Sequence, residues 1–336
     1  MKEDGKMKYE REELIPFLHN LCGTFTLDGD MGYSRFTAGQ LDYYGRRSDL
    51  DFVRSHTSAG VFLECVTDAE EISFVYRIHT EKGAWMDRSG IDIWENGIFS
   101  ENIPLVITDS EWISVRYARR EKEPSRVRIC FPNGVIFLPK DFELGNAQPT
   151  PKKDRLILFY GDSLTQSAYI RTPSLSWYGY VAEYLGAEYI NRGIGSMIFE
   201  AGSLPDETDL EPDMIFIEYG GNDAAKTPDN DSAERNAIEW IDKLEELYPN
   251  AEKYCILTDF RCPGDGSEND VRLHDLCARH AGICTLRGIP YIHGRELIPA
   301  IEGLFIEDRV HFNEAGSAIV ANNLIIKLNQ IRKNSL

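Results

Sequence analysis

The sequence predicts a two-domain α/β protein, in which an antiparallel β-sandwich of the jelly-roll kind precedes a doubly wound, flavodoxin-like parallel sheet. Three observations lead to this prediction. The chain has 336 residues, more than the ~100–200 residues of one ordinary domain. Short strand-like runs fill residues 24–144. After residue 154, strand-like runs alternate with helical ones, which is typical of a parallel sheet with helices on both faces.

The first half is predicted to begin with a short amphipathic helix or lead-in segment at residues 9–20. Six apolar or alternating runs follow, at 61–66, 72–77, 91–94, 112–117, 127–131 and 135–138. Turn residues separate them, notably Asn96-Gly97 and Pro132-Asn133-Gly134, and the second group is typical of a hairpin. Because no long helix is expected between these short strands, they favour an antiparallel sandwich.

A polar stretch with two prolines follows the last of these strands and is typical of a linker. We therefore expect an N-terminal domain over residues 1–145, a linker over 146–153 and a second domain over 154–336.

The second half carries strand-like runs at 156–160, 188–191, 214–219, 254–258 and 290–292. Helical runs are expected at 177–185, 232–248 and 270–287, with a last helix from about residue 313. On the first of these, Trp177, Val181, Tyr184 and Leu185 would share one face. Open sheets of this kind bind ligands at the carboxyl ends of their strands, so that edge is where a site is expected.

Charge and composition exclude several classes of partner. Lys and Arg number 36 against 55 Asp and Glu, a net charge of −19, which repels phosphate backbones and anionic membrane surfaces. Neither nucleic acid nor a membrane is an expected partner, and nothing in the sequence supports a homo-oligomer.

The chain is expected to be cytoplasmic. Its first eight residues are charged throughout and lack the apolar core of a signal peptide, and no later run is long enough to span a bilayer. The seven cysteines are odd in number and scattered, as in a protein with reduced thiols. No cofactor or metal is expected, because the helical pair His274 and His280 is six residues apart and cannot face one ion.

A candidate nucleophile follows the first strand of the second half. Ser163 stands in the sequence Gly161-Asp162-Ser163-Leu164, directly after an apolar run. The glycine permits a sharp turn, so the serine hydroxyl can be exposed at the carboxyl end of the strand. A serine nucleophile also needs a base, a group that orients the base, and donors for the oxyanion.

The base and its orienting group are expected near the C-terminus. Asp308 precedes His311 by three residues in a loop that leads into the last helix. The carboxylate can turn back onto imidazole Nδ1 and leave Nε2 to accept the serine proton. The alternative is that Asp308 pairs with Arg309 and that His311 merely lies near a helix start.

Two other strand ends offer oxyanion donors. Asn222 follows the glycines that end the strand at 214–219, and its amide can project into the crevice. Backbone N–H groups of the glycine-containing turn 191–196 can do the same. The alternative for both is an ordinary turn. The second turn is also a weak Gly-x-Gly, but it lacks the third glycine of a dinucleotide site.

Together these four blocks resemble those of the SGNH/GDSL hydrolase superfamily. They are Gly161-Asp162-Ser163-Leu164, Asn191-x-Gly193-x-Gly195, Gly220-x-Asn222-Asp223 and Asp308-x-x-His311. The resemblance covers residues 154–332 and includes the order and spacing of the blocks. A β-sandwich before such a domain is similar to the arrangement in some carbohydrate esterases that remove acetyl groups.

The resemblance implies roles for six residues. Ser163 would be the nucleophile, His311 the general base and then acid, and Asp308 its orienting group. The oxyanion hole would combine the Ser163 N–H, the Asn222 amide and a backbone N–H of the second block. The family usually places a glycine five residues after the asparagine, where this chain has Ser196, so either Gly195 or Ser196 would donate.

The sequence thus predicts a serine esterase that hydrolyses a short, acetyl-type ester on a carbohydrate through an acyl-enzyme. Its expected partner is a small-molecule or oligosaccharide ester. The alternatives are a lysophospholipase, a thioesterase or an arylesterase, and, in another class, a non-catalytic carbohydrate-binding protein that keeps the fold. The N-terminal domain could wall the active site, bind a glycan or hold protomers together.

Overall fold

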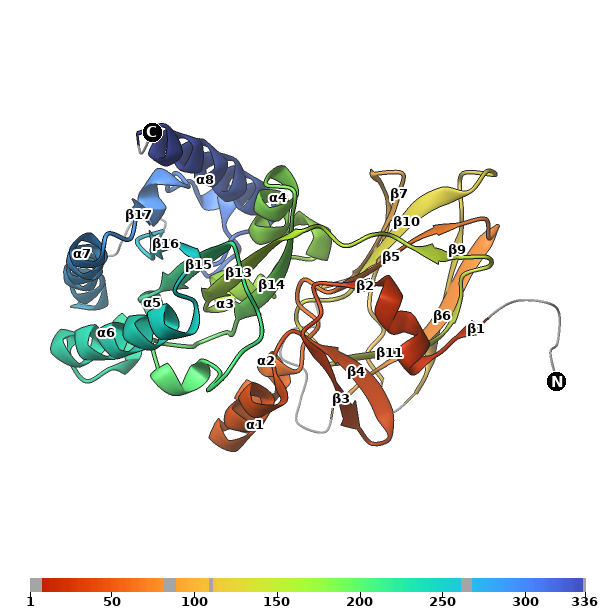
Figure 1. The fold of residues 1–336 in the computed structure, drawn as a ribbon, viewed down its shortest axis with the longest axis horizontal. Helices are drawn as coiled ribbons and strands as arrows, with labels where there is room; N and C mark the ends of the chain where they lie inside the picture. Colours follow the sequence, from red (N-terminus) through yellow and green to blue (C-terminus); the bar gives the residue numbers. More distant parts are fainter. Residues whose placement is uncertain (1–7, 81–88, 109–110, 261–267, 335–336) are drawn as a thin grey trace.

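The computed structural model describes residues 8–80, 89–108, 111–260 and 268–334. Antiparallel sheets form the N-terminal part and a parallel sheet with helices forms the C-terminal part (Figure 1). The predicted fold class is therefore confirmed. The predicted domain limits at residues 145 and 154 stay a prediction.

Two antiparallel sheets face each other in the N-terminal part. One has the order β1–β11–β6–β9 and the other the order β12–β5–β10–β7–β8, with β2 also paired to β5. The strands are β1 (Lys8–Tyr9), β2 (Leu18–His19), β5 (Phe62–Thr67), β6 (Glu71–Ile78), β7 (Ile91–Glu95), β8 (Ile98–Ile103), β9 (Ile113–Ala118), β10 (Ser125–Cys130), β11 (Phe137–Glu143) and β12 (Gln148–Pro149). Alternate residues of β6 are buried between the sheets, because successive side chains of a strand point to opposite faces.

The predicted hairpin around Asn133 is wrong. The two strands that flank it, β10 and β11, belong to different sheets. Asn133 is fully buried, and its amide donates to the carbonyl of Ser167 and the hydroxyl of Ser176 at 3.2 and 3.0 Å. The turn therefore crosses between sheets and is bonded to the C-terminal part, which its local sequence does not reveal. The other expected turn, at Asn96-Gly97, does join a hairpin, β7–β8.

The C-terminal part is a five-stranded parallel sheet in the order β14–β13–β15–β16–β17, the flavodoxin-like order. Its strands are β13 (Arg155–Gly161), β14 (Ala187–Gly193), β15 (Met214–Tyr219), β16 (Glu252–Leu257) and β17 (Tyr291–His293). Its helices are α3 (Ser163–Gln166), α4 (Trp177–Tyr184), α5 (Gly221–Lys226), α6 (Asn230–Leu247), α7 (Glu268–Arg287) and α8 (Glu314–Asn334).

The helices cover both faces of this sheet. Apolar residues of α4 and α8 share one core cluster with the sheet, and those of α6 and α7 share another. On α4, Trp177 and Val181 are buried, but Tyr184 is 55% exposed. Tyr184 was expected on the same face as Trp177 and Val181, but it is not buried with them.

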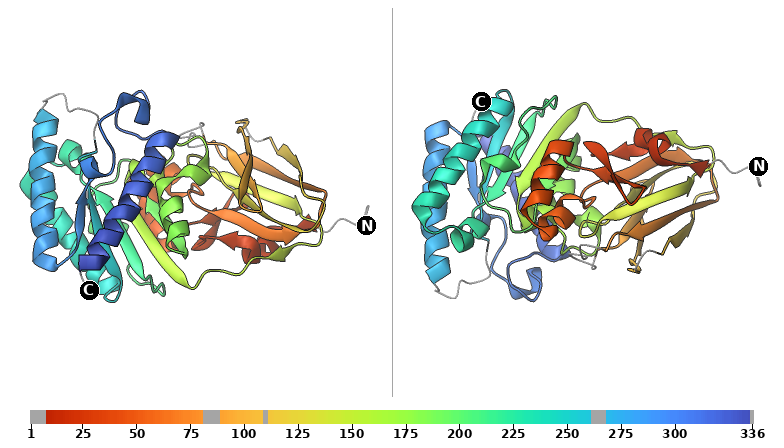
Figure 2. Two further views of the ribbon diagram at one scale, coloured as in Figure 1. Left: turned by 90° about the horizontal axis from the view of Figure 1, so that it is seen from above. Right: turned by 90° about the horizontal axis from the view of Figure 1, so that it is seen from below.

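Two helices in the N-terminal half were not expected. They are α1 (Ala38–Arg47) and α2 (Asp49–Ser55), and they follow the hairpin of β3 (Gly23–Leu27) and β4 (Asp30–Ser34). Leu41 and Tyr44 of α1 belong to the same core cluster as Leu158 and Ile190 of the parallel sheet. In the connection 194–213 between β14 and β15, all of it described, the only helical element is the 3₁₀ turn η3 (Ala201–Ser203). Helix α1 lies beside this connection and covers the sheet there (Figure 2, right).

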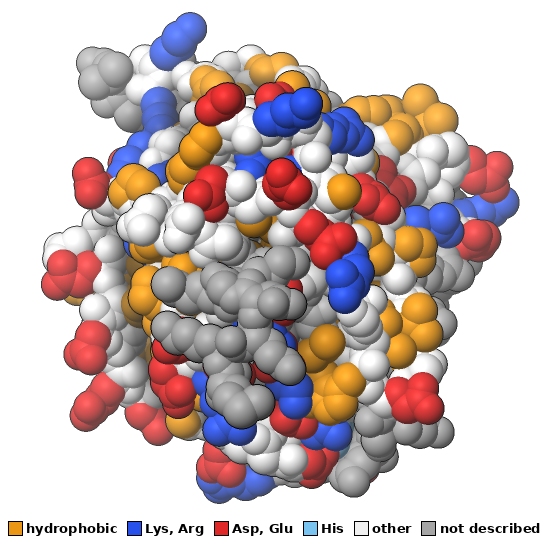
Figure 3. All heavy atoms as spheres, turned by 90° about the vertical axis from the view of Figure 1, so that its right-hand side faces the viewer, with side chains coloured by type: hydrophobic (Ala, Val, Ile, Leu, Met, Phe, Trp, Pro, Cys, Tyr) orange, Lys and Arg blue, Asp and Glu red, His pale blue; other side chains and the backbone are white. Residues whose placement is uncertain are grey.

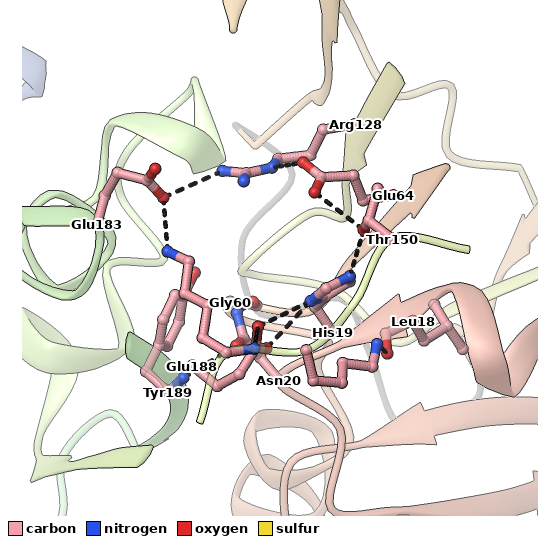
Figure 4. A network of polar contacts seen from close by, with 12 residues as sticks. Leu18, His19, Asn20, Gly60, Glu64, Arg128, Thr150, Glu183, Glu188 and Tyr189 are labelled. Carbon is pink, nitrogen blue, oxygen red and sulfur yellow. Dashed lines mark hydrogen bonds and ion pairs between the residues drawn. The ribbon is translucent and has the colours of Figure 1, made fainter. Parts of the chain in front are cut away.

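A polar network joins the two parts (Figure 4). His19 Nδ1 lies 3.0 Å from a carboxylate oxygen of Glu188, and His19 Nε2 lies 2.9 Å from the Thr150 hydroxyl. Arg128 donates to Glu64 at 2.7 Å and lies 3.8 Å from Glu183 of α4. These contacts border a cavity of about 190 Å³ between the parts, which Phe62, Trp94, Tyr180 and Tyr189 also line.

The outer face of the sandwich carries acidic and basic side chains interspersed (Figure 3), although the chain has a net charge of −19. Among the described helices, none combines the length and the apolar composition that a membrane crossing requires. The six cysteines within the described ranges are free thiols, and Cys262 lies outside those ranges.

Candidate active site

Ser163 follows the carboxyl end of β13, the second strand of the parallel sheet, as the first residue of α3. Asp162 precedes it and caps this short helix, because one of its carboxylate oxygens accepts the Leu164 N–H at 3.0 Å. A Cβ on Gly161 would lie 2.1 Å from the Thr165 hydroxyl, so only glycine fits where the chain turns from strand to helix. The turn presents the partly exposed Ser163 hydroxyl at the strand end.

His311 and Asp308 lie opposite this serine, in the loop before α8. Ser163 Oγ is 2.6 Å from His311 Nε2, and His311 Nδ1 is 2.6 Å from Asp308 Oδ2. The other carboxylate oxygen of Asp308 accepts the backbone N–H groups of Val310 and His311 at 2.9 and 3.0 Å. The alternative pairing of Asp308 with Arg309 is not what the structure shows, since the Arg309 guanidinium contacts Glu302.

The environment of Asp308 favours its ionised form. Burial opposes ionisation, but the hydrogen bonds from the His311 ring and from two backbone N–H groups outweigh it and lower the pKa of this carboxyl to about 2. Asp308 therefore remains a carboxylate at any pH near neutrality. The Tyr169 ring stacks on the His311 ring with the two centroids 3.9 Å apart, which further limits how the imidazole can turn.

Asn222 lies at the start of α5, beyond the end of β15. Its side-chain Nδ2 donates to Asp162 Oδ2 at 2.6 Å. An amide nitrogen carries two hydrogens, so this bond orients the group and leaves one hydrogen for a ligand. Asp162 thus links the turn that carries Ser163 to Asn222.

The second block of the motif adopts a tight loop after β14. Gly195 donates its N–H to Gln166 Oε1 at 2.8 Å, so that N–H already has a partner. Ser196 has a φ of +65°, a left-handed conformation that usually favours glycine and matches the glycine of the family at this position. Gly193 packs against α3, since a Cβ there would lie 2.4 Å from the Gln166 nitrogen. These contacts favour Ser196 over Gly195 as the donor of this block.

Three buried carboxyls lie beneath the site. Burial raises the pKa of Asp162, Glu218 and Asp223. For Asp223 the pKa reaches about 7, because burial and the nearby charge of Asp162 outweigh the hydrogen bond that the Phe199 N–H donates. Within the described residues Asp223 Oδ2 has no hydrogen-bond partner, as a carboxyl that is neutral in the folded state would permit.

Asp223 should therefore make stability depend on pH. Folding raises the pKa of this carboxyl from ~4 to about 7, so the folded protein binds the proton more tightly than the unfolded chain. The proton therefore stabilises the folded state below pH ~4, and this stabilisation is lost as the pH rises through 7. We expect Asp223→Asn, which keeps an acceptor for the Phe199 N–H, to flatten the fall in the free energy of unfolding between pH 5 and 8. Urea unfolding of wild type and Asp223→Asn at several pH values between 5 and 8 measures how the free energy of unfolding changes with pH. An unchanged slope would contradict the assignment.

The pocket at the serine is small. It measures about 10 Å³, and its lining residues are Ser163, Leu164, Ser167, Tyr169, Ile170, His311 and Phe312. The larger cavity between the two parts shares none of these residues. Among the described residues, no three His, Cys, Asp or Glu side chains are grouped to hold a metal ion.

Two arginines from the N-terminal half also reach the site, and reasoning from the sequence did not select them. Arg35 is fully buried and donates to the carbonyls of Asn191 and Gly193 at 2.8 and 2.6 Å. Arg54 of α2 donates to the carbonyl of Gly195 at 2.8 Å. No short motif marks either residue, because the contacts join segments about 140 or more residues apart.

Comparison with known proteins agrees with this geometry. Residues 159–319 match the model of the GDSL-like Lipase/Acylhydrolase family. No curated protein sequence matches the chain.

Three solved structures are similar along the whole chain. The salicylyl-acyltransferase SsfX3 from a tetracycline biosynthetic pathway has a TM-score of 0.82 at 15% identity, and the match covers 98% of both chains. A family two carbohydrate esterase from Cellvibrio japonicus has a TM-score of 0.65 at 16% identity over 97% of this chain and 98% of that one. The acetyl xylan esterase Est2A from the rumen bacterium Butyrivibrio proteoclasticus has a TM-score of 0.60 at 14% identity over 98% and 99%.

The likeness to these structures shows that both parts of the fold recur together. The family match over residues 159–319 identifies the C-terminal part of the chain as a GDSL-like lipase/acylhydrolase domain, preceded by an antiparallel β-structure as in these solved structures.

Proposed function

We propose that the protein removes short acyl groups, most readily acetyl, from a carbohydrate by serine catalysis. Ser163 is the nucleophile, His311 the general base and then acid, and Asp308 the group that orients His311. The observation that carries this proposal is the unbroken series of contacts from Ser163 Oγ to His311 Nε2 and from His311 Nδ1 to Asp308 Oδ2, each of 2.6 Å.

The reaction proceeds in two steps. Ser163 Oγ attacks the ester carbonyl while His311 Nε2 takes its proton, and the tetrahedral oxyanion collapses to an acyl-enzyme as His311 returns the proton to the leaving sugar hydroxyl. Water then attacks the acyl group with His311 again as base, which releases the acid and restores Ser163. The Asp308 carboxylate stabilises the imidazolium that forms in both steps.

The oxyanion is stabilised by three donors in this proposal. They are the N–H of Ser163, the N–H of Ser196 and the side-chain amide of Asn222. The bond from the Gly195 N–H to Gln166 supports Ser196 as the donor of the second block, and the bond from Asn222 to Asp162 supports a fixed orientation of the amide.

The small pocket supports a short acyl chain. A volume of about 10 Å³ accommodates about one water-sized group, which suits the methyl of an acetyl group. We expect kcat/KM for a chromogenic butyrate to be at least about tenfold below that for the acetate, because butyryl is two methylenes longer and each extra methylene in such a pocket is worth ~1–3 kcal/mol. Ile170→Ala, which widens the pocket, should narrow this difference. A preference of wild type for longer chains would contradict the acetyl assignment and favour a lysophospholipid-type substrate.

The carbohydrate part of the proposal is supported by the names of two structural relatives, an acetyl xylan esterase and a family two carbohydrate esterase. Acetate release from acetylated xylo- and gluco-oligosaccharides, compared with a chromogenic acetate, tests it. We expect wild type to release acetate from these oligosaccharides and Ser163→Ala to release none. Hydrolysis of the chromogenic ester without release from any acetylated sugar would contradict the sugar substrate and leave the esterase in place.

A second candidate is transfer of the acyl group to a hydroxyl acceptor. It is favoured by the similarity of the whole chain to a salicylyl-acyltransferase at a TM-score of 0.82. The acyl-enzyme would be the same and only the second nucleophile would differ. A product acylated on an added alcohol or sugar, formed faster than free acid, would favour transfer over hydrolysis.

A further inference from the structure

The carbonyl of Gly195 and the N–H of Ser196 belong to the same peptide group. The described chain contains no cis peptide bond, and in a trans peptide the C=O and the N–H point in opposite directions. A group that fixes this carbonyl therefore fixes the direction of the Ser196 N–H. Arg54 is such a group, since its guanidinium donates to the Gly195 oxygen at 2.8 Å.

Arg54 is itself held in place. It is 7% exposed, and its guanidinium lies 3.7 Å from the Asp51 carboxylate in the preceding turn of α2. Its own carbonyl accepts hydrogen bonds from Arg35 at 2.8 Å and from Gln166 at 3.2 Å. The same Gln166 side chain accepts the Gly195 N–H. Arg54 and the loop it contacts thus form one connected network across the two halves of the chain.

The loop has further anchors on either side of this peptide. Arg35 donates to the Gly193 carbonyl at 2.6 Å, and Lys226 of α5 donates to the Ser196 carbonyl at 2.5 Å. Lys226 and Gln166 come from the C-terminal part, whereas Arg35 and Arg54 come from the N-terminal half. The segment that the family model matches begins only at residue 159, so neither arginine belongs to it.

We propose that Arg54 is a positioning residue for catalysis, supplied by the N-terminal half, which aims the Ser196 N–H at the oxyanion. This inference rests on the role proposed above for Ser196. It assigns to the N-terminal half a part in the chemical step that does not depend on recognising a sugar.

Two physical effects act together at this peptide. The guanidinium holds the carbonyl in one direction, which counters the tendency of a non-glycine residue such as Ser196 to leave the left-handed region. A cation bound to the carbonyl also polarises the peptide and strengthens its N–H as a donor. Both effects matter most when negative charge develops on the substrate, so they act on kcat more than on KM.

The test compares Arg54→Met and Arg54→Lys with Arg47→Met. Arg47 is the matched control, because it lies at the same junction, and within the described part of the chain its guanidinium pairs with Asp51 and Glu200 and not with residues 193–196. Hydrogen exchange of the intact protein, read on peptides that cover residues 193–197, measures the loop without requiring activity. Kinetics with a small chromogenic acetate, which needs no sugar binding, measures catalysis. Melting temperatures and exchange in the β-sandwich show whether each variant is folded.

We expect Arg54→Met to accelerate exchange in residues 193–197 and to lower kcat about 10- to 100-fold, less than the 10²–10³-fold cost of losing an oxyanion donor outright. KM should change by no more than about twofold. Arg54→Lys should recover part of kcat, and Arg47→Met should leave both the loop and kcat near wild type.

Two results would overturn the proposal. One is unchanged exchange of the loop in folded Arg54→Met, and the other is a loosened loop with an unchanged kcat. Absence of Ser163-dependent turnover in wild type is a different failure. It would contradict the proposed function, and the exchange data would still decide whether Arg54 holds the loop.

Discussion

Ser163→Ala is expected to lower kcat for a chromogenic acetate by about 10⁴-fold or more, as removal of a serine nucleophile does in other triad enzymes. The reason is that the variant keeps the oxyanion donors and the base but has no atom that can form the acyl-enzyme. Ser163 is partly exposed, and among the described residues its hydroxyl hydrogen-bonds only to His311. Its loss should therefore leave the fold intact.

The control for this prediction is Ser232→Ala, which removes a hydroxyl at the start of α6, outside the site. Initial rates for the three proteins at equal concentrations, with circular dichroism to verify folding, provide the comparison. A Ser163→Ala enzyme that retains more than a few per cent of wild-type turnover would show that another nucleophile acts.

Asn222→Ala is expected to lower kcat by ~10²–10³-fold with little change in KM. The amide has one hydrogen committed to Asp162, and its second hydrogen is the one proposed to meet the oxyanion. Because Asn222 is only partly buried and lies in the first turn of a short helix, its truncation should not unfold the protein.

The matched control is Asn230→Ala, which removes an amide that bonds to Asp275 and Arg272 at the junction of α6 and α7. Wild-type turnover in folded Asn222→Ala would remove Asn222 from the mechanism. A raised KM with unchanged kcat would instead indicate that the amide binds the ester equally in the ground state and in the transition state.

The sequence was most informative where local pattern and tertiary structure agree. Strands such as Met214–Tyr219 are buried along their whole length, so a continuous apolar run identifies them. The Ser163, Asn222 and His311 blocks could be placed near each other because each follows a strand of a parallel sheet or lies in the final loop. Their chain order was thus enough to predict the edge of the sheet at which they meet.

The sequence was least informative where a segment packs against a distant part of the chain. Helices α1 and α2 carry few long apolar runs. Helix α1 is stabilised by packing on the parallel sheet, which begins more than 100 residues later, and Val53 of α2 packs with Ile136 and Leu138. Buried arginines cannot be told from exposed ones by composition, so Arg35 and Arg54 gave no signal. The turn at Asn133 was misassigned for the same reason, since its partners Ser167 and Ser176 lie across the junction.

The central claim is that Ser163 forms a covalent acyl intermediate. Intact-protein mass spectrometry after rapid acid quench of the reaction with a chromogenic acetate tests it most directly, followed by peptide mapping of the modified residue. We predict the added mass of one acetyl group on the peptide that contains Ser163, in wild type and not in Ser163→Ala. Acetylation at another residue, with Ser163 left unmodified while the ester is hydrolysed, would contradict the account.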